Sequence, residues 1–237
     1  YEVIVQTLNG EDKTDNYDIE YVYGLLYVLP KAIIVETGTT DFEYDGDPHS
    51  YTDGAVASEL VAGQKVVYDG KGATPVTNVR RDSNGCVLGE PNVHGVLVKT
   101  EDGTDKTYNY DIKYAYGTLT VWPRAIVVKT ATEYFIYDGK EHSNTNVEEA
   151  RRIVAGHTAV YDRNGTTPVI DVKRSETDAS IILGTDNEFA VVIFDADGTD
   201  NTYNYNITYE YGLLYVLPKA IIVTTGTKDI EYDGDPH

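Results

Sequence analysis

Hydrophobic and polar positions alternate near the end of the chain, from Ile207 to Leu217. One parity is apolar or aromatic throughout: Ile207, Tyr209, Tyr211, Leu213, Tyr215 and Leu217. A period of two over this length predicts a half-buried β-strand, bent at Gly212. The run Glu188–Asp195 predicts another strand, and Asp197-Gly198 predicts a hairpin turn between the two because both residues tolerate positive φ.

The same pattern occurs three times in the chain. The sequence Tyr-Asp-Ile-Glu-Tyr-Val-Tyr-Gly at 17–24 returns in related form at 110–117 and 205–212. Tyr-Asp-Gly at 44–46 likewise returns at 137–139 and 232–234. Units of this length are the size of small autonomous domains. We therefore expect a section of a longer tandem array, divided as follows: residues 1–30 close one unit, 31–123 and 124–218 are complete units, and 219–237 open the next.

The units join without a linker. Pro30, Pro123 and Pro218 mark the three joins, and a basic residue followed by an apolar run comes directly after each proline. Proline fixes its own φ and favours extended geometry in the residue before it. No Gly/Ser-rich segment intervenes, so we expect short, stiff joins.

Helical periodicity is weak within each unit. The best candidate is Val147–Val154, with Asn146 as a possible N-cap and Gly156 as a stop, and its counterpart Ala55–Val61 is weaker. The rest of a unit resembles a series of short strands separated by turns. The predicted fold is all-β: tandem small antiparallel β-sandwiches, loosely immunoglobulin-like (Ig-like), with at most one short helix each. The alternative is an α+β unit of the β-grasp kind, with a small sheet and one helix.

The join sequences carry a family resemblance. Ile-Thr-Tyr-Glu-Tyr-Gly-Leu-Leu-Tyr-Val-Leu-Pro, followed by Lys-Ala-Ile-Ile-Val-Thr-Thr-Gly and then Tyr-Asp-Gly, resembles tandem repeats of large surface adhesins from Gram-positive gut bacteria. These repeats are grouped as MBG-type or bacterial Ig-like stalk domains. The resemblance covers the whole chain and implies an extracellular protein attached to the cell wall, in which such units form a stalk. It carries no binding residue, because the middles of the two units differ freely.

Charge excludes two classes of partner. The chain has 237 residues, with 19 Lys and Arg against 39 Asp and Glu, for a net charge of −20. Such a surface repels nucleic acid and anionic membranes. No apolar run reaches the ~20 residues of a membrane helix, so we expect no membrane insertion. The single cysteine, Cys86, allows no disulfide within the chain.

Two acidic segments are candidates for metal binding. Asp195, Asp197 and Asp200 place oxygen ligands around a glycine turn, which is a partial match to a calcium loop. An ordinary Asp-Gly hairpin explains the same residues. Asp45, Asp47 and His49 alternate along an extended segment, and here the alternative is a polar turn with a histidine that packs or hydrogen-bonds.

No catalytic motif repeats. The chain lacks Gly-x-Ser-x-Gly, His-Glu-x-x-His and a phosphate-binding glycine loop, and Cys86 aligns with Ala179 in the next unit. We therefore expect no enzyme activity, and no cofactor other than calcium.

These observations together predict a stiff structural spacer or fibre at the cell surface. Its partners are the neighbouring repeats and other copies in a fibre. Tyr17, Tyr21, Tyr23 and their equivalents are expected to be half-buried strand residues that also fill the contact between units. One alternative is a module that binds a host glycan or protein through the variable segments Val79–Leu88 and Val172–Leu183. The other is an accessory domain of a secreted enzyme.

Overall fold

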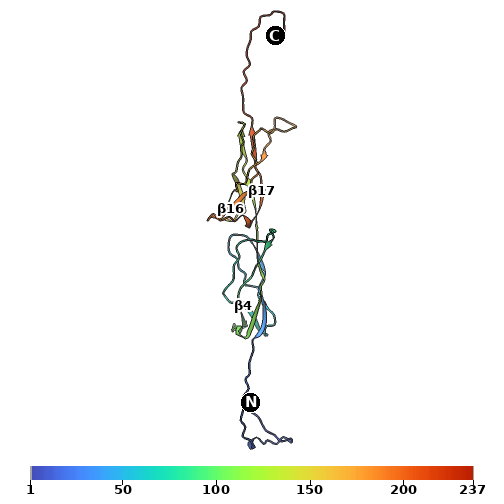
Figure 1. Cartoon of the computed structure of the whole chain (residues 1–237), viewed down its shortest axis with the longest axis vertical. Coiled ribbons are helices and arrows are strands. Elements are labelled where there is room, and N and C mark those ends of the chain that lie inside the picture. Colours follow the sequence, from blue (N-terminus) through green and yellow to red (C-terminus); the bar gives the residue numbers. More distant parts are fainter. Residues whose placement is uncertain (1, 237) are drawn as a thin grey trace.

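The computed structural model describes residues 2–236 and is strongly elongated (Figure 1). Two β-rich units follow one another along the long axis, and an extended segment leaves each end. Strands dominate, and the described residues contain no α-helix, only three 3-10 helices of three residues each. The all-β prediction is confirmed, and the β-grasp alternative lacks the helix that it needs.

Unit 1, residues 31–123, consists of short strands and one 3-10 helix. Its elements are β1 (Lys31–Glu36), β2 (Thr40–Glu43), β3 (Val56–Ala57), β4 (Gln64–Tyr68), β5 (Arg80–Arg81), β6 (Val87–Leu88), β7 (Glu90–Pro91), β8 (Val96–Thr100), η2 (Thr107–Asn109), β9 (Tyr110–Ala115) and β10 (Thr118–Trp122).

Unit 2, residues 124–218, repeats this order with fewer short strands. Its elements are β11 (Arg124–Thr130), β12 (Glu133–Ile136), β13 (Val147–Arg151), β14 (Thr158–Tyr161), β15 (Thr185–Asp186), β16 (Val191–Phe194), η3 (Thr202–Asn204), β17 (Tyr205–Glu210) and β18 (Leu213–Leu217). The remaining 3-10 helix, η1 (Thr14–Asn16), lies in the segment before unit 1.

Each unit contains two three-stranded sheets, in the orders β3-β1-β9 and β2-β10-β7 in unit 1 and β13-β11-β17 and β12-β18-β15 in unit 2. The pairs β4-β8 and β14-β16 are antiparallel. The first two strands of a unit run parallel to its last two: Lys31 pairs with Tyr110, and Arg124 pairs with Tyr205. The sheets are therefore mixed. Among the described residues, every strand pair lies on one side of Pro123.

The chain changes sheet at a glycine near the end of each unit. At Gly212 it leaves the sheet of β17 and enters that of β18, so the predicted single bent strand is two strands. The buried parity changes too, since Tyr205 is buried before the glycine and Leu214 and Val216 after it. A Cβ on Gly212 would lie 2.4 Å from the carbonyl oxygen of Thr130, so only glycine fits this crossing.

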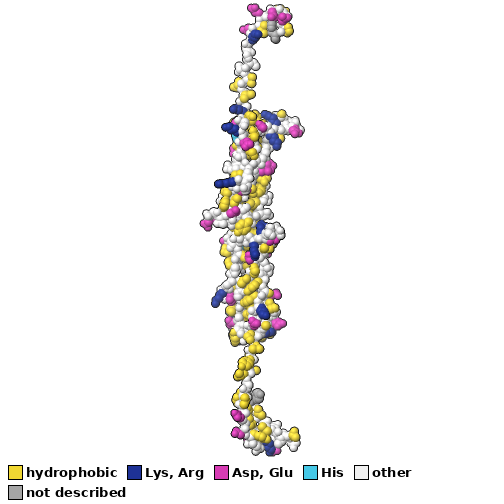
Figure 2. Space-filling view, viewed as in Figure 1, with side chains coloured by type: hydrophobic (Ala, Val, Ile, Leu, Met, Phe, Trp, Pro, Cys, Tyr) yellow, Lys and Arg dark blue, Asp and Glu magenta, His cyan; other side chains and the backbone are white. Residues whose placement is uncertain are grey.

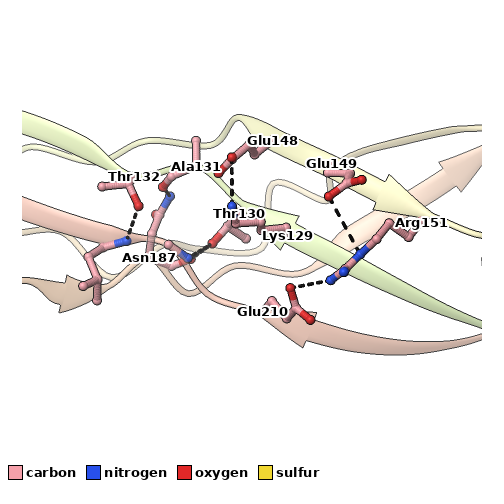
Figure 3. A network of polar contacts seen from close by, with 11 residues as sticks. Lys129, Thr130, Ala131, Thr132, Glu148, Glu149, Arg151, Asn187 and Glu210 are labelled. Atoms are coloured by element: carbon pink, nitrogen blue, oxygen red, sulfur yellow. Dashed lines mark hydrogen bonds and ion pairs between the residues drawn. The ribbon is translucent and has the colours of Figure 1, made fainter.

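A polar clamp holds each crossing (Figure 3). The Thr130 hydroxyl donates to the carbonyl of Asn187 at 2.9 Å and accepts the Gly212 N–H at 2.9 Å. The Asn187 amide donates to the Ala131 carbonyl at 2.9 Å. Unit 1 has the same clamp, built from Thr37, Asn92 and Gly117. The clamp satisfies buried backbone groups where strand pairing is interrupted.

The predicted helix at Val147–Val154 is wrong. This segment contains strand β13, which pairs antiparallel with β11, and the register shifts between Lys129 and Thr130. The bulge leaves both Glu148 and Glu149 exposed between the half-buried Val147 and Ala150. A bulge thus gives a strand the three-residue apolar spacing of a helix. On the solvent side, Glu148 forms an ion pair with Lys129 at 2.9 Å, and Arg151 forms one with Glu210 (Figure 3).

The apolar side chains form three buried clusters along the axis. The lower cluster of unit 1 contains Ile33, Val35, Val96, Val98 and Tyr110. The upper cluster of unit 2 contains Val169, Leu214 and Val216. The largest cluster lies between them and includes residues of both units.

Candidate functional site: the junction between the two units

The largest apolar cluster crosses the boundary at Pro123. Unit 1 contributes Tyr44, Val76, Val79, Leu119 and Val121, and unit 2 contributes Ile126, Val128, Ala159, Phe189, Val191, Ile193 and Tyr205. The top of one unit and the bottom of the next therefore share one core, although no strand pairs across the boundary. Burial of this apolar area favours a fixed contact between the units.

Asn204 is the polar centre of this contact and is fully buried. Its side-chain carbonyl accepts the backbone N–H of Val79 at 2.8 Å. Its amide donates to the Asn78 side chain at 2.9 Å and to the Asn201 side chain at 3.2 Å. A directional network inside an apolar contact permits fewer orientations than apolar packing alone.

Tyr44 connects the network to the aromatic part of the junction. Its hydroxyl donates to Asn201 at 3.2 Å, and its ring meets the Tyr205 ring edge-on at a centroid distance of 5.4 Å. Burial, reinforced by the nearby Tyr205, raises the pKa of Tyr44 to about 12. The Tyr205 hydroxyl in turn contacts His157 Nδ1 at 2.8 Å. Among the equivalents of Tyr17, Tyr21 and Tyr23, Tyr205 lies in this contact and is buried rather than half-buried, whereas Tyr44 belongs to another repeated segment and was not predicted here.

Two arginines lie at the rim of the junction. The Arg124 guanidinium donates to the carbonyl of Tyr44 in unit 1 at 3.3 Å and to the carbonyl of Arg152 at 2.7 Å. Arg152 pairs with Glu43 of unit 1 at 3.1 Å. Both partners in this ion pair are exposed, so it contributes little stability but fixes which charges face each other.

The residues of the predicted calcium loop hold a turn. Asp195 Oδ1 accepts the backbone N–H groups of Asp197 and Thr199, and Oδ2 accepts from the Asn201 amide at 2.9 Å. The Asp200 carboxylate accepts hydrogen bonds from the backbone N–H and the side-chain hydroxyl of Thr202. These hydrogen bonds lower the pKa of Asp195, chiefly through the Thr199 N–H. They also position Asn201 for the junction.

These contacts are those of a tight Asp-Gly turn held by the two aspartates. Within residues 2–236, no group of three or more His, Cys, Asp and Glu side chains is arranged to hold a metal ion. The two strands predicted on either side of this turn do not pair with each other, because β16 pairs with β14 and β17 pairs with β11. The returning chain meets the end of β16 through the bridge Phe194–Asp200 and through two backbone hydrogen bonds, from Asp195 N–H to Thr199 and from Asn201 N–H to Ile193. The predicted strand Glu188–Asp195 is reduced to Val191–Phe194.

The other metal candidate is also a structured turn. The Asp45 carboxylate contacts His49 Nε2 at 2.8 Å and accepts the Asp47 N–H, and the His49 ring stacks on Phe42 at 4.5 Å. His142 repeats the contact with Asp138 at 2.9 Å in unit 2. Each histidine packs and hydrogen-bonds within its own turn.

The asparagines of the junction were not predicted from the sequence. One signal was present, because Asn16, Asn109 and Asn204 all precede the first tyrosine of the repeated segment. The partners Asn78 and Val79 lie in the variable part of the unit, more than a hundred residues away, and nothing local connects them to Asn204.

No described helix is long and apolar enough to cross a membrane.

Comparisons with known proteins give no relative. No protein-family model, no curated protein and no solved structure matches this chain.

Proposed function

We propose that the chain is a stiff structural spacer, part of a stalk or fibre of an extracellular protein attached to the cell wall. The junction at Pro123 carries the proposal. A spacer needs domains that keep a fixed direction, and here successive units share an apolar core and a buried asparagine network. The join contains no flexible residues that would let the units turn independently.

The shape supports the same role. The units lie in line along the long axis (Figure 1). Extended strands rise ~3.3 Å per residue, so a unit whose long axis is spanned by ~10–12 extended residues adds ~35–40 Å to the stalk. The negative surface keeps neighbouring stalks apart. Length and direction, rather than a reaction, are what this architecture supplies.

Small-angle X-ray scattering of the chain tests the proposal. We expect the scattering profile of a straight rod across the two units, with extended ends. A profile that requires an ensemble of bent arrangements at Pro123 would contradict a stiff spacer.

A binding role has one observation in its favour. In each unit an exposed arm projects from the sheets: β5 and β6 form the arm of unit 1, and the bridge Arg174–Ile182 closes that of unit 2. Ile181 and Leu183 on the second arm are exposed. Saturable binding of the chain to a glycan or mucin array, lost when the 175–181 loop is replaced by Gly and Ser residues, would support recognition through the arms. If the chain bound nothing on the array, the spacer role would be the one that remains.

A further inference from the structure

The joins at Pro30 and Pro218 have the same sequence. Residues 24–35 and 212–223 are identical, Gly-Leu-Leu-Tyr-Val-Leu-Pro-Lys-Ala-Ile-Ile-Val. The similarity continues, because residues 219–237 differ from 31–49 only at Thr224, Lys228 and Ile230. The segment 124–142 differs from them at about half of its positions. The unit that starts at Lys219 therefore begins like unit 1.

The upper end of unit 2 presents an uncovered version of the surface that unit 1 buries at Pro123. Tyr137 is the equivalent of Tyr44, and it is 40% exposed where Tyr44 is 2% exposed. The bridges His49–Val76 and His142–Val169 show that the same backbone pairing occurs at both ends. At the position of Asn78, unit 2 has the exposed carboxylate of Asp171.

The lower end of unit 1 presents the complementary surface. Asn109 is the equivalent of the buried Asn204 and is exposed. Lys106 replaces Asn201, and both residues are the N-caps of their 3-10 helices. Glu59 replaces Arg152, and both have positive φ, 59° and 64°.

These replacements change the charge at matched positions. At Pro123 the side-chain oxygens of Asn78 and Asn201 bind the same nitrogen of Asn204, so they lie within about 6 Å of each other. The corresponding residues of the two free ends are Asp171 and Lys106. Two neutral amides are thus replaced by an anion and a cation, which attract at this separation.

The other orders of units lose these pairings. Unit 1 stacked on a second unit 1 would place Glu43 opposite Glu59, where the observed junction has the Glu43–Arg152 ion pair. Unit 2 stacked on a second unit 2 would place the Asp171 carboxylate beside Asn201, without the lysine. Like charges disfavour a contact, and a carboxylate placed without the lysine lacks the attraction of the ion pair.

We propose that the upper end of unit 2 docks on the lower end of a unit of the 31–123 kind through an ion pair between Asp171 and Lys106. The partner is a second copy of unit 1, either following in the same chain or in another copy. The two kinds of junction then fix the order of units in the stalk. This inference rests on the proposed function, because it assumes that every join is a fixed contact like that at Pro123.

The test uses an extended chain in which a second copy of residues 31–123 follows Pro218. Every Cys86 is replaced by serine, and two spin labels are placed on exposed strand positions, Thr208 and the Lys65 equivalent of the added copy. We expect a narrow distance distribution across Pro218. Asp171→Lys should broaden it and lower the unfolding midpoint of the added unit by about 4 °C. Adding Lys106→Asp in the added copy should restore both.

Two matched controls make the result specific. In the 237-residue chain Asp171 is exposed, and Asp171→Lys should leave the unfolding midpoint unchanged. Adding a copy of 124–218 in place of 31–123 should give a broad distribution. Equal distributions for the two added units, or no effect of Asp171→Lys in the extended chain, would overturn the inference. A broad distribution across Pro123 itself would instead overturn the proposed function.

Discussion

One twelve-residue sequence occurs twice in this chain and has opposite environments. In residues 212–223 the first half is the buried strand β18, with Leu214 at 1% and Val216 at 2% exposure. The same residues at 24–29 are extended but uncovered, with Leu26 at 94% and Val28 at 89%. The second half reverses the comparison, because Ile33 is buried in β1 while its counterpart Ile221 is 79% exposed.

The difference lies in the partners rather than in the local sequence. Strand β18 lies between β12 and β15 of its own unit, whereas residues 24–29 have no such strands beside them within the described chain. Figure 2 shows the apolar side chains uncovered along the segment before unit 1. Strand propensity makes these residues extended in both places, but burial requires a complete unit.

The largest effect should come from placing a charge in the covered copy. Val216→Asp would leave a carboxylate in the apolar cluster of unit 2, and we expect a loss of more than about 4 kcal/mol in unfolding free energy. Val28→Asp, at the same sequence position, should change it by less than about 0.5 kcal/mol. Urea unfolding of both variants measures the difference, and equal losses would show that residues 24–29 are also packed.

Gly212→Ala should have the next largest effect. The new Cβ would meet backbone atoms at the sheet crossing, and overpacking of this kind costs about 1–3 kcal/mol. Gly24→Ala is the matched control, because nothing lies within 4 Å of the Cβ position there. Thermal unfolding should separate the two variants, and a destabilised Gly24→Ala protein would contradict the comparison.

Asn204→Ala extends the comparison to the junction. It leaves the buried N–H of Val79 without an acceptor, which costs about 1–3 kcal/mol. The exposed equivalent, Asn109→Ala, should cost less than about 0.5 kcal/mol. Unfolding midpoints give the energies. If the Asn204→Ala protein were as stable as the Asn109→Ala protein, the asparagine network would not stabilise the junction.

The smallest effect is a loss of stability that begins only at alkaline pH. The pKa of Tyr44 is raised to about 12 in the folded protein, above its ordinary value of 10.0. The folded state therefore retains a proton that the unfolded state loses, and this contribution to stability is complete below pH 10 and lost as the pH rises to 12. Ultraviolet titration should show a tyrosine that ionises near pH 12 and is absent in Tyr44→Phe. If the variant titrates like the parent chain, Tyr44 is not the buried group.

Local sequence was sufficient for the fold class but not for its details. Period-two alternation and the repeated glycine turns predicted strands. In the structure every described strand pair lies on one side of Pro123. The direction of pairing is not encoded in that alternation, so the parallel pairs β1-β9 and β11-β17 were not expected. The bulge opposite Lys129 and Thr130 gave β13 the spacing of a helix.

The junction was harder to predict because its residues are distant in sequence. Proline and the absence of a linker indicated a stiff join, but they do not identify Asn204 and Val79 as partners. The sequence allowed Asp195 to be a calcium ligand or part of an ordinary Asp-Gly hairpin, and in the structure its oxygens accept backbone N–H groups and the Asn201 amide. A single sequence shows which polar side chains lie in a turn, but it does not show which groups they hydrogen-bond to.

The distance across Pro123 tests the central claim most directly. Spin labels at Lys65→Cys and Thr208→Cys, both exposed strand positions, report on the two units when Cys86 is replaced by serine. The account predicts a single narrow distance distribution, which Asn204→Ala broadens. A broad distribution in the chain with Asn204 intact would show that the units move independently, and would contradict a stiff junction.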